Sequence, residues 1–333
     1  MSKDQKIRIG MTVCAVVVVV AVILAVSGIF SSTGLASYAN AEKYTAGPAT
    51  ISENVRNLDI GWVNGSVTVA YHQDSTVLLE ETANRELNED TEMRWWLDGN
   101  TLRVQYAKPG LRLDWNLEKH LTLTLPEGTE LGEVQIGATS ADLVIPEMKA
   151  ENIILETTSG DVKATAEAET VIIAGTSGDM EANLTVKKLE AGTTSGSLNF
   201  TLTGTEQAAL TSTSGSIRVT GDCVDKLDAG STSGRIEVTF DEMGDAKVGN
   251  TSGGVTVRTG KVNSLDIGCT SGEITAALPA EPGFTLQVET TSGDFNTDMS
   301  LTKNGDIYTC GDGSARINIG ATSGNVRVEA WQK

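Results

Sequence analysis

The chain has 333 residues and a formal net charge of −19, from 25 basic and 44 acidic side chains. An acidic body of this kind repels nucleic-acid phosphates, so composition argues against nucleic acid as a partner. Aromatic residues make up 5% of the chain and there are 35 glycines, a balance that favours short strands and many turns.

An uncharged apolar stretch opens the chain. It covers residues 9–30, which are 22 positions without a charged side chain. As an α-helix it would cross a hydrocarbon core of roughly 30 Å. Basic residues precede it, so residues 1–8 are expected to stay cytoplasmic and the body to be exported. The sequence therefore predicts a single-pass signal anchor in the cell membrane, with an extracytoplasmic C-terminal body.

A cleaved signal peptide is the alternative, because Ala39-Asn40-Ala41 resembles a cleavage site. That site lies well past residue 30, and the apolar run exceeds the roughly 7–15 residues of such a peptide. These two features favour retention. Residues 31–54 follow, rich in Ser, Ala, Thr and Gly over most of their length, and are expected to be a linker.

Residues 55–133 are expected to form degenerate rungs and a cap. A corner at Val63-Asn64-Gly65 aligns with the later repeats, and a second stands at Thr139-Ser140-Ala141. The interval from the first corner to the second equals four periods of the later repeat. Alternating apolar residues predict strands at Thr101–Tyr106 and Leu117–Leu125.

The remainder, residues 134–333, contains a serial repeat. Thr-Ser-Gly occurs nine times, and the successive intervals between the motifs are 18, 18, 19, 19, 19, 19, 21 and 31. A fixed period near 19 with no helical pattern is typical of a stacked repeat array. The nine motifs begin at Thr158, Thr176, Thr194, Thr213, Thr232, Thr251, Thr270, Thr291 and Thr322.

Alignment on the Thr separates inward from outward positions. The positions five before, three before and four after the Thr hold 27 apolar residues, whereas the position five after it holds nine polar ones. This alternation places one face in a core and the other in water. The sequence therefore predicts an all-β fold, a β-solenoid of rungs about 19 residues long with Thr-Ser-Gly corners, besides the N-terminal transmembrane helix.

The alternation changes phase at the motif, because odd offsets are inward before it and even offsets after it. The chain must therefore bend or bulge at Thr-Ser-Gly. Glycine is expected to supply an unusual backbone angle there, so Gly234→Val should cost on the order of 1–3 kcal/mol through a forced positive φ. The last and longest interval leaves room for a hairpin around Asn304-Gly305.

Three cysteines fall in the exported part, at Cys223, Cys269 and Cys310, and the sequence leaves their pairing open. There is no CxxC pair and no neighbouring histidine, so no zinc ligand set is present. Small thiols buried in a core are the favoured interpretation.

Several motifs recur together: LDIGWVNGSVTV at 58–69, LTLTLP at 121–126, and the serial TTSGDV, GTSGDM and STSGRI rungs. In these motifs the chain resembles the bacterial putative-adhesin family of β-strand repeat proteins, over about residues 55–330. The resemblance implies a β-solenoid at the outer face of the cytoplasmic membrane, with a role in envelope-stress sensing or surface adhesion. It brings no catalytic residues with it.

Two chemistries compete with a structural interpretation of the motif. Nine corner serines suggest a nucleophile array, but the only histidines, His72 and His120, lie outside the regular rungs. Repeated Ser-Gly-Asp suggests stacked calcium, but Arg235 and neutral residues interrupt that column and leave at most one site near Asp161 and Asp179. The sequence predicts no catalytic residue, no cofactor and no systematic metal site.

A carbohydrate-active β-helix enzyme acting on envelope polysaccharide is the alternative function. Such a site needs paired carboxylates and aromatic platforms, whereas the acidic residues here are scattered over outward columns. Trp95, Trp96 and Trp115 form either a ligand patch or the packing of a cap, and packing is favoured. We therefore expect a non-catalytic binding, adhesion or envelope-stress scaffold that meets a cell-wall polymer, an envelope protein or another copy of itself.

Overall fold

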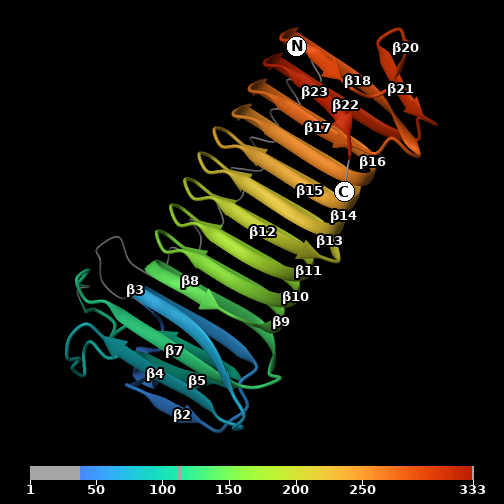
Figure 1. Cartoon of the computed structure of the whole chain (residues 1–333). Coiled ribbons are helices and arrows are strands. Elements are labelled where there is room, and N and C mark those ends of the chain that lie inside the picture. Colours follow the sequence, from blue (N-terminus) through green and yellow to red (C-terminus); the bar gives the residue numbers. More distant parts are fainter. Residues whose placement is uncertain (1–37, 112–113, 332–333) are drawn as a thin grey trace. The chain divides into compact units, whose positions relative to one another are not determined.

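The computed structural model describes residues 38–111 and 114–331, which are almost entirely β-structure (Figure 1). Their one helical segment is the short 3-10 helix η2, Ala41–Lys43. Across these ranges, no helix has the length and apolar character needed to cross a membrane. The predicted tail at 1–8 and anchor at 9–30 lie outside the described residues. The chain forms two compact units, which meet in sequence between Leu184 and Thr185.

The first unit is organised around a parallel pair of long strands, β3 and β8. Asn64 of β3 lies opposite Ser140 of β8, so the two degenerate corners occupy the same place in adjacent strands, as their alignment predicts. β8 then pairs in parallel with β9 and β10. These strands are β3 Asn57–His72, β8 Glu130–Ile145, β9 Lys149–Thr157 and β10 Val162–Gly175.

The other edge of β3 carries the chain between the two corners. β6 and β7 pair with it in parallel, with Asn57 opposite Thr101 and Gly65 opposite Lys119. The segment between the corners thus adds one rung beside β3, so its length of four periods does not correspond to four separate rungs. The two predicted strands are confirmed. They are β6 Thr101–Gln105 and β7 Lys119–Pro126.

Antiparallel strands complete this unit. β4 pairs with β7 and β2, while β5 pairs with β6 and β1. Two of these strands lie inside the stretch 31–54 that composition assigns to a linker, so ordered structure begins earlier than predicted. The polar composition there reflects short edge strands rather than a flexible spacer. The bounds are β1 Thr45–Ala46, β2 Ala49–Ile51, β4 Val77–Ala83 and β5 Arg94–Asp98.

The second unit, residues 185–333, repeats one parallel register. Ile217, Ile236 and Val255 lie opposite one another on β14, β15 and β16, each one repeat period after the last, and Figure 1 shows these strands side by side. The predicted period is therefore the offset between paired strands. The strands up to this point are β11 Met180–Thr193, β12 Leu198–Thr203, β13 Thr205–Ser212, β14 Ile217–Ser231, β15 Ile236–Ser252 and β16 Val255–Ser271.

The last rungs do not follow sequence order. β16 pairs with β22 and β17 with β23, while β22 pairs on its other side with β18 and β23 with β19. The final motif, at Thr322, is thereby inserted between those at Thr270 and Thr291. A β20–β21 hairpin at Asn304-Gly305 allows the return. These strands are β17 Ile274–Leu278, β18 Gly283–Ser292, β19 Phe295–Thr297, β20 Thr302–Asn304, β21 Ile307–Gly311, β22 Ala315–Ser323 and β23 Val326–Ala330.

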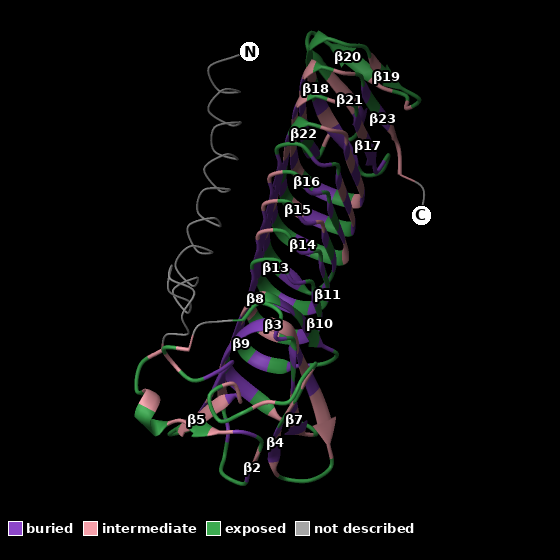
Figure 2. Ribbon diagram, turned by 90° about the vertical axis from the view of Figure 1, so that its left-hand side faces the viewer, coloured by how far each residue is buried: buried purple, intermediate pink, exposed green. Residues whose placement is uncertain are grey.

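The predicted inward columns form the core. Of the 27 apolar residues at the three inward offsets, 25 are buried, and the alternation of buried and exposed residues is visible along the strands in Figure 2. The two exceptions are Val288 and Phe295, which are only partly buried and both belong to the rung at Thr291. Their exposure identifies β18 and β19 as an end of the stacked core.

A column directly before the motif stabilises the corners. At four motifs this residue is a buried Thr or Ser, and its hydroxyl accepts a hydrogen bond from the N–H of the motif glycine three residues later. We call these contacts the corner ladder. The oxygen–nitrogen distances are 2.9 Å for Thr157–Gly160, 3.1 Å for Thr193–Gly196, 2.8 Å for Ser212–Gly215 and 3.0 Å for Ser231–Gly234. Each bond satisfies a buried amide at a point where the strand ladder is interrupted.

Close packing between rungs explains the motif glycine. A Cβ on Gly234 would lie 1.9 Å from the carbonyl oxygen of Gly215 in the preceding rung. Gly234 does not have a positive φ, so the predicted cause is wrong at this corner, whereas Gly253 does, at 132°. The chain needs glycine at Gly234 because two backbones approach too closely for any side chain.

Candidate functional site

The candidate nucleophiles do not form an active site. The corner serines donate their backbone N–H groups to the preceding rung, as Ser233 does to Thr213 at 2.9 Å. His72 contacts the carbonyl of Thr76 through Nε2 at 2.6 Å. In the described part of the chain, the ring nitrogens of His72 and His120 form hydrogen bonds with Thr76 and Ser66, and neither of these is a serine of the nine motifs.

One serine–histidine contact does exist, and sequence reasoning missed it. Ser66 Oγ lies 2.9 Å from His120 Nδ1, because the parallel register places these residues on neighbouring strands. The third member that a triad would need is Glu118, whose Oε1 is 3.9 Å from His120 Nε2, beyond hydrogen-bonding distance. His120 is also about half exposed, so this pair has the geometry of a surface cross-strand contact.

The aspartates of the calcium hypothesis bind backbone amides. Asp142 Oδ1 accepts from the N–H of Asp161, and Asp161 Oδ1 accepts from the N–H of Asp179, both at 2.9 Å. Each carboxylate thereby links one corner to the next. Among the described residues no group of three His, Cys, Asp or Glu side chains gathers in a way that would hold a metal ion.

The tryptophans separate into two environments. The Trp96 ring meets Tyr44 edge-on at 5.7 Å between centroids, and Lys43 Nζ lies 4.6 Å from its centre. Arg103 also lies over this ring, at 5.9 Å, while it contacts Asp59 and Asp98. Because cations already occupy the π-system, Trp96 packs the cap and does not offer a free stacking platform.

Trp115 and Trp95 do not join that cluster. Trp115 is 54% exposed, and its carbonyl accepts from Asn64 Nδ2 at 3.1 Å. Trp95 lies on β5 opposite Val104 of β6. Among the ring contacts of the described residues, neither joins Trp96, so the three tryptophans do not make one patch.

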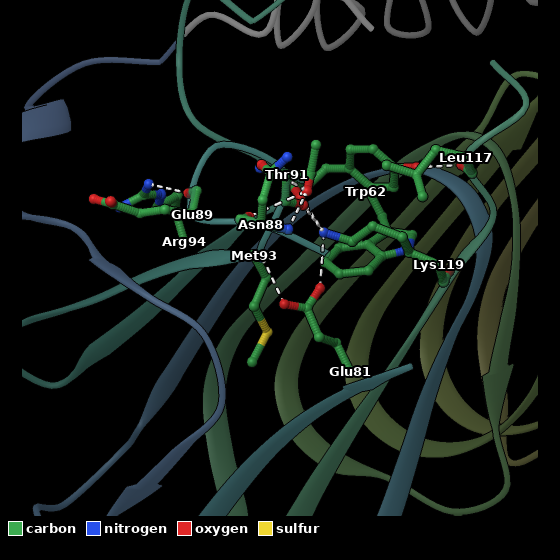
Figure 3. A network of polar contacts seen from close by, with 10 residues as sticks. Trp62, Glu81, Asn88, Glu89, Thr91, Met93, Arg94, Leu117 and Lys119 are labelled. Atoms are coloured by element: carbon green, nitrogen blue, oxygen red, sulfur yellow. Dashed lines mark hydrogen bonds and ion pairs between the residues drawn. The ribbon is translucent and has the colours of Figure 1, made fainter. Parts of the chain in front are cut away.

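A buried ion pair forms the most elaborate polar network of the first unit (Figure 3). Lys119 Nζ lies 2.7 Å from Glu81 Oε2, and the two side chains are 0% and 2% exposed. The ammonium also donates to the carbonyls of Thr91 at 2.7 Å and Tyr106 at 2.5 Å. Glu81 accepts the N–H of Met93 at 2.8 Å. The three N–H donors of the ammonium thus have three acceptors, which are Glu81 and the carbonyls of Thr91 and Tyr106.

Aromatic rings enclose this ion pair. Lys119 Nζ lies 5.1 Å from the Trp62 centroid and 4.5 Å from that of Tyr106, and these rings meet edge to face at 5.1 Å. Trp62 Nε1 donates to the Lys119 carbonyl at 2.9 Å. Burial lowers the pKa of Lys119, an effect that Glu81 opposes. Since both side chains are almost completely buried, the network holds β4, β7 and the 88–93 loop together.

The three thiols are unpaired. Cys269 and Cys310 are buried, with sulfur–oxygen contacts to Gly253 at 3.4 Å and Ala280 at 3.7 Å, while Cys223 is exposed. The expectation of small core thiols is confirmed for two of the three. Burial raises the pKa of Cys269 and Cys310, which makes both poor nucleophiles at neutral pH.

The outward offsets of the second unit carry polar side chains, and we call the charged groups at Arg218, Glu237, Glu242 and Lys261 the outward face. Identical offsets on neighbouring strands bring opposite charges together at a spacing of one rung. Arg218 meets Glu237 at 2.7 Å and Lys261 meets Glu242 at 3.0 Å. Three of these four side chains are exposed and Glu237 is partly buried, so the pairs contribute little stability.

Geometry and register define a class: all-β repeat proteins made of stacked parallel rungs with glycine corners. Comparison of the sequence with family profiles identifies the family within this class. The profile of the Toastrack DUF4097 family matches residues 55–259 and 166–329. The chain belongs to this family, and the resemblance seen in its repeat motifs is confirmed.

Two further comparisons complete this picture. Among solved structures, one described as "a putative cell adhesion protein" from Clostridium sporogenes is similar, at 13% identity, over 86% of this chain and 100% of that one, with a TM-score of 0.20. A search of curated proteins finds no match.

Proposed function

We propose that this chain is a non-catalytic binding module, a β-solenoid tethered to the cell membrane through residues 9–30 with its body outside the cytoplasm. Its ligand is a cell-wall polymer or an envelope protein that lies across the rungs. The observation that carries the proposal is the outward face. Two pairs of opposite charges, Arg218 with Glu237 and Lys261 with Glu242, join neighbouring strands at one strand spacing, about 4.8 Å, and this spacing suits an extended polymer or a flat protein surface.

The use of the conspicuous polar groups supports binding over catalysis. The corner hydroxyls before the motif bind glycine amides, as Ser231 does, and the corner aspartates bind the next rung, as Asp142 does. His120 is exposed and Ser66 partly buried, and the pair lacks an orienting third group at hydrogen-bond distance. The repeated polar groups at the corners thus stabilise the scaffold, and the side chains that do not repeat from rung to rung are available to bind a partner.

Co-sedimentation tests the proposal. Full-length protein is mixed with purified insoluble cell-wall polymer, and the bound fraction is measured over increasing salt. We expect saturable binding that is weakened by R218E/K261E, which reverses two outward-face charges. The control, Arg85→Glu, reverses an exposed charge that belongs to the first unit and not to the outward columns, and it should bind as the wild type does.

An activity measurement accompanies the binding assay. Release of soluble fragments from the polymer, or labelling of Ser66 by a fluorophosphonate probe, would contradict the non-catalytic proposal and favour a carbohydrate-active or esterase function instead. If R218E/K261E co-sediments with the polymer to the same extent as the wild type, the outward face is not the binding surface.

A further inference from the structure

The rung at Thr291 ends the stack of the second unit, and its outer edge is only half covered. One edge of β18 and β19 pairs with β22 and β23 along its length. On the opposite edge, β21 pairs antiparallel with Gly283–Gln287 and goes no further. In the part of the chain that the structure describes, no strand pairs with the outer edge from Val288 to Thr297.

Side-chain exposure gives independent support for this open edge. Val288 and Phe295 occupy inward columns whose equivalents one rung inside, Ile319 and Val326, are 2% and 0% exposed. Here both are partly exposed, and the corner between them, 289–294, is exposed throughout. Tyr308 of β21 covers one side of Phe295, with ring centroids 5.2 Å apart. A further strand could therefore pair with this edge over about one strand length, where it would meet unpaired backbone groups and the apolar side chains of Val288 and Phe295.

Charge indicates what fits this edge. Four exposed carboxylates lie within this edge, directly after it or in the β20–β21 turn, and no ion pair engages any of them within the described structure: Glu289, Asp294, Asp298 and Asp306. The neighbouring ammonium of Lys303 lies over the Tyr308 ring at 4.9 Å. A second copy of this acidic chain would place like charges against one another if it docked edge to edge, which disfavours self-pairing.

We propose that the edge Val288–Thr297 binds an extended segment of another polypeptide by strand addition, and that this segment alternates apolar with Lys or Arg side chains. Backbone hydrogen bonds would continue the ladder, the apolar side chains would cover Val288 and Phe295, and the basic ones would pair with the four carboxylates. This site does not include the outward-face charges Arg218 and Lys261. The strand-addition proposal is therefore tested independently of the polymer-binding proposal.

Fluorescence anisotropy on the full-length chain tests this. The probe is a labelled Lys-Val-Lys-Val-Thr-Val-Lys peptide, compared with the same peptide carrying Glu for Lys and with one carrying Pro for the central Val. We expect saturable binding of the basic peptide alone, because proline cannot donate to the ladder. Reversal of the edge charges in E289K/D294K should weaken it about tenfold or more.

The matched control is E206K/D225K, which makes the same charge change at exposed positions of β13 and β14, whose edges are paired. It should bind as the wild type does. Hydrogen exchange supplies the second readout, since strand addition should slow exchange of amides within 288–297. Three results would overturn the proposal: equal binding of the proline peptide, equal loss in both charge variants, or no added protection. Edge-dependent dimerisation in sedimentation velocity would instead assign the edge to a second copy.

Discussion

The buried hydroxyl of Ser231 accepts a hydrogen bond from the backbone N–H of Gly234 at 3.0 Å. The same hydroxyl donates to the carbonyl of Gly215 in the preceding rung at 3.4 Å, and Asn250 reaches Gly234 in the same way at 2.6 Å. The position before Thr-Ser-Gly therefore closes its own corner and joins it to the previous one.

Ser231→Ala tests the corner ladder. The substitution leaves the Gly234 amide buried without an acceptor, so we expect a loss of about 1–3 kcal/mol in the free energy of unfolding. Ser233→Ala is the control, because Ser233 is exposed and belongs to the motif, and its change should stay within about 0.5 kcal/mol. Denaturant titration measures both. Equal losses would show that the motif serine, and not the ladder, stabilises the corner.

Gly234→Ala separates close packing from backbone angle. A single methyl group would meet the Gly215 carbonyl oxygen at 1.9 Å, so the two rungs must separate, at a cost of about 3 kcal/mol or more. Gly268→Ala should do the opposite, because nothing lies within 4 Å of its added Cβ and the unfolded chain loses entropy. Thermal unfolding should therefore show a lowered midpoint for the first variant and an unchanged or raised one for the second.

The repeat columns predict the core well because burial in stacked strands depends on a period of two. Leu227 and Ile236 lie on opposite sides of a corner, and both are buried as their offsets require. The order of the last rungs has no such signal. β22 has the same columns as β18, so the pattern fits either order, and only the contacts of the β20–β21 return decide it.

The buried ion pair could have been predicted in part from the sequence alternation. Lys119 falls on the inward phase of the run Leu117, Leu121, Leu123 and Leu125, so a charge at a core position stands out in the alternation. Glu81 has the same phase as Leu79. The alternation does not show that these two strands are antiparallel neighbours. Pairing of Ala83 with Lys119 fixes that, and it depends on tertiary contacts.

A double-mutant cycle tests the coupling of Glu81 and Lys119. Lys119→Met leaves a buried carboxylate without its cation, and we expect a loss of about 3–5 kcal/mol. Glu81→Gln keeps an acceptor for Met93 while it removes the charge, so E81Q/K119M should lose much less than the sum of the single changes. Denaturant unfolding of the four proteins gives the interaction energy. Strict additivity would mean that the two charges do not stabilise each other in the folded state.

Glu156 provides a pH-dependent prediction. It is 7% exposed, both carboxylate oxygens lack a hydrogen-bond partner among the described residues, and burial raises its pKa from 4.5 to about 7. Because the folded state holds this proton more tightly than the unfolded state, the stability that protonation provides is present below pH 4.5. It is lost as pH rises towards 7, by about 3 kcal/mol in all.

Glu156→Gln removes that titration. The variant should be less sensitive to pH between 4.5 and 7 than the wild type, and near pH 7.5 it should be the more stable of the two, because an amide costs less to bury than a carboxylate. Glu181→Gln, an exposed change in the same unit, should keep the wild-type slope. Unfolding free energies measured at half-unit steps of pH compare the three. Parallel curves for wild type and Glu156→Gln would mean that water or a cation reaches this carboxylate in the folded protein.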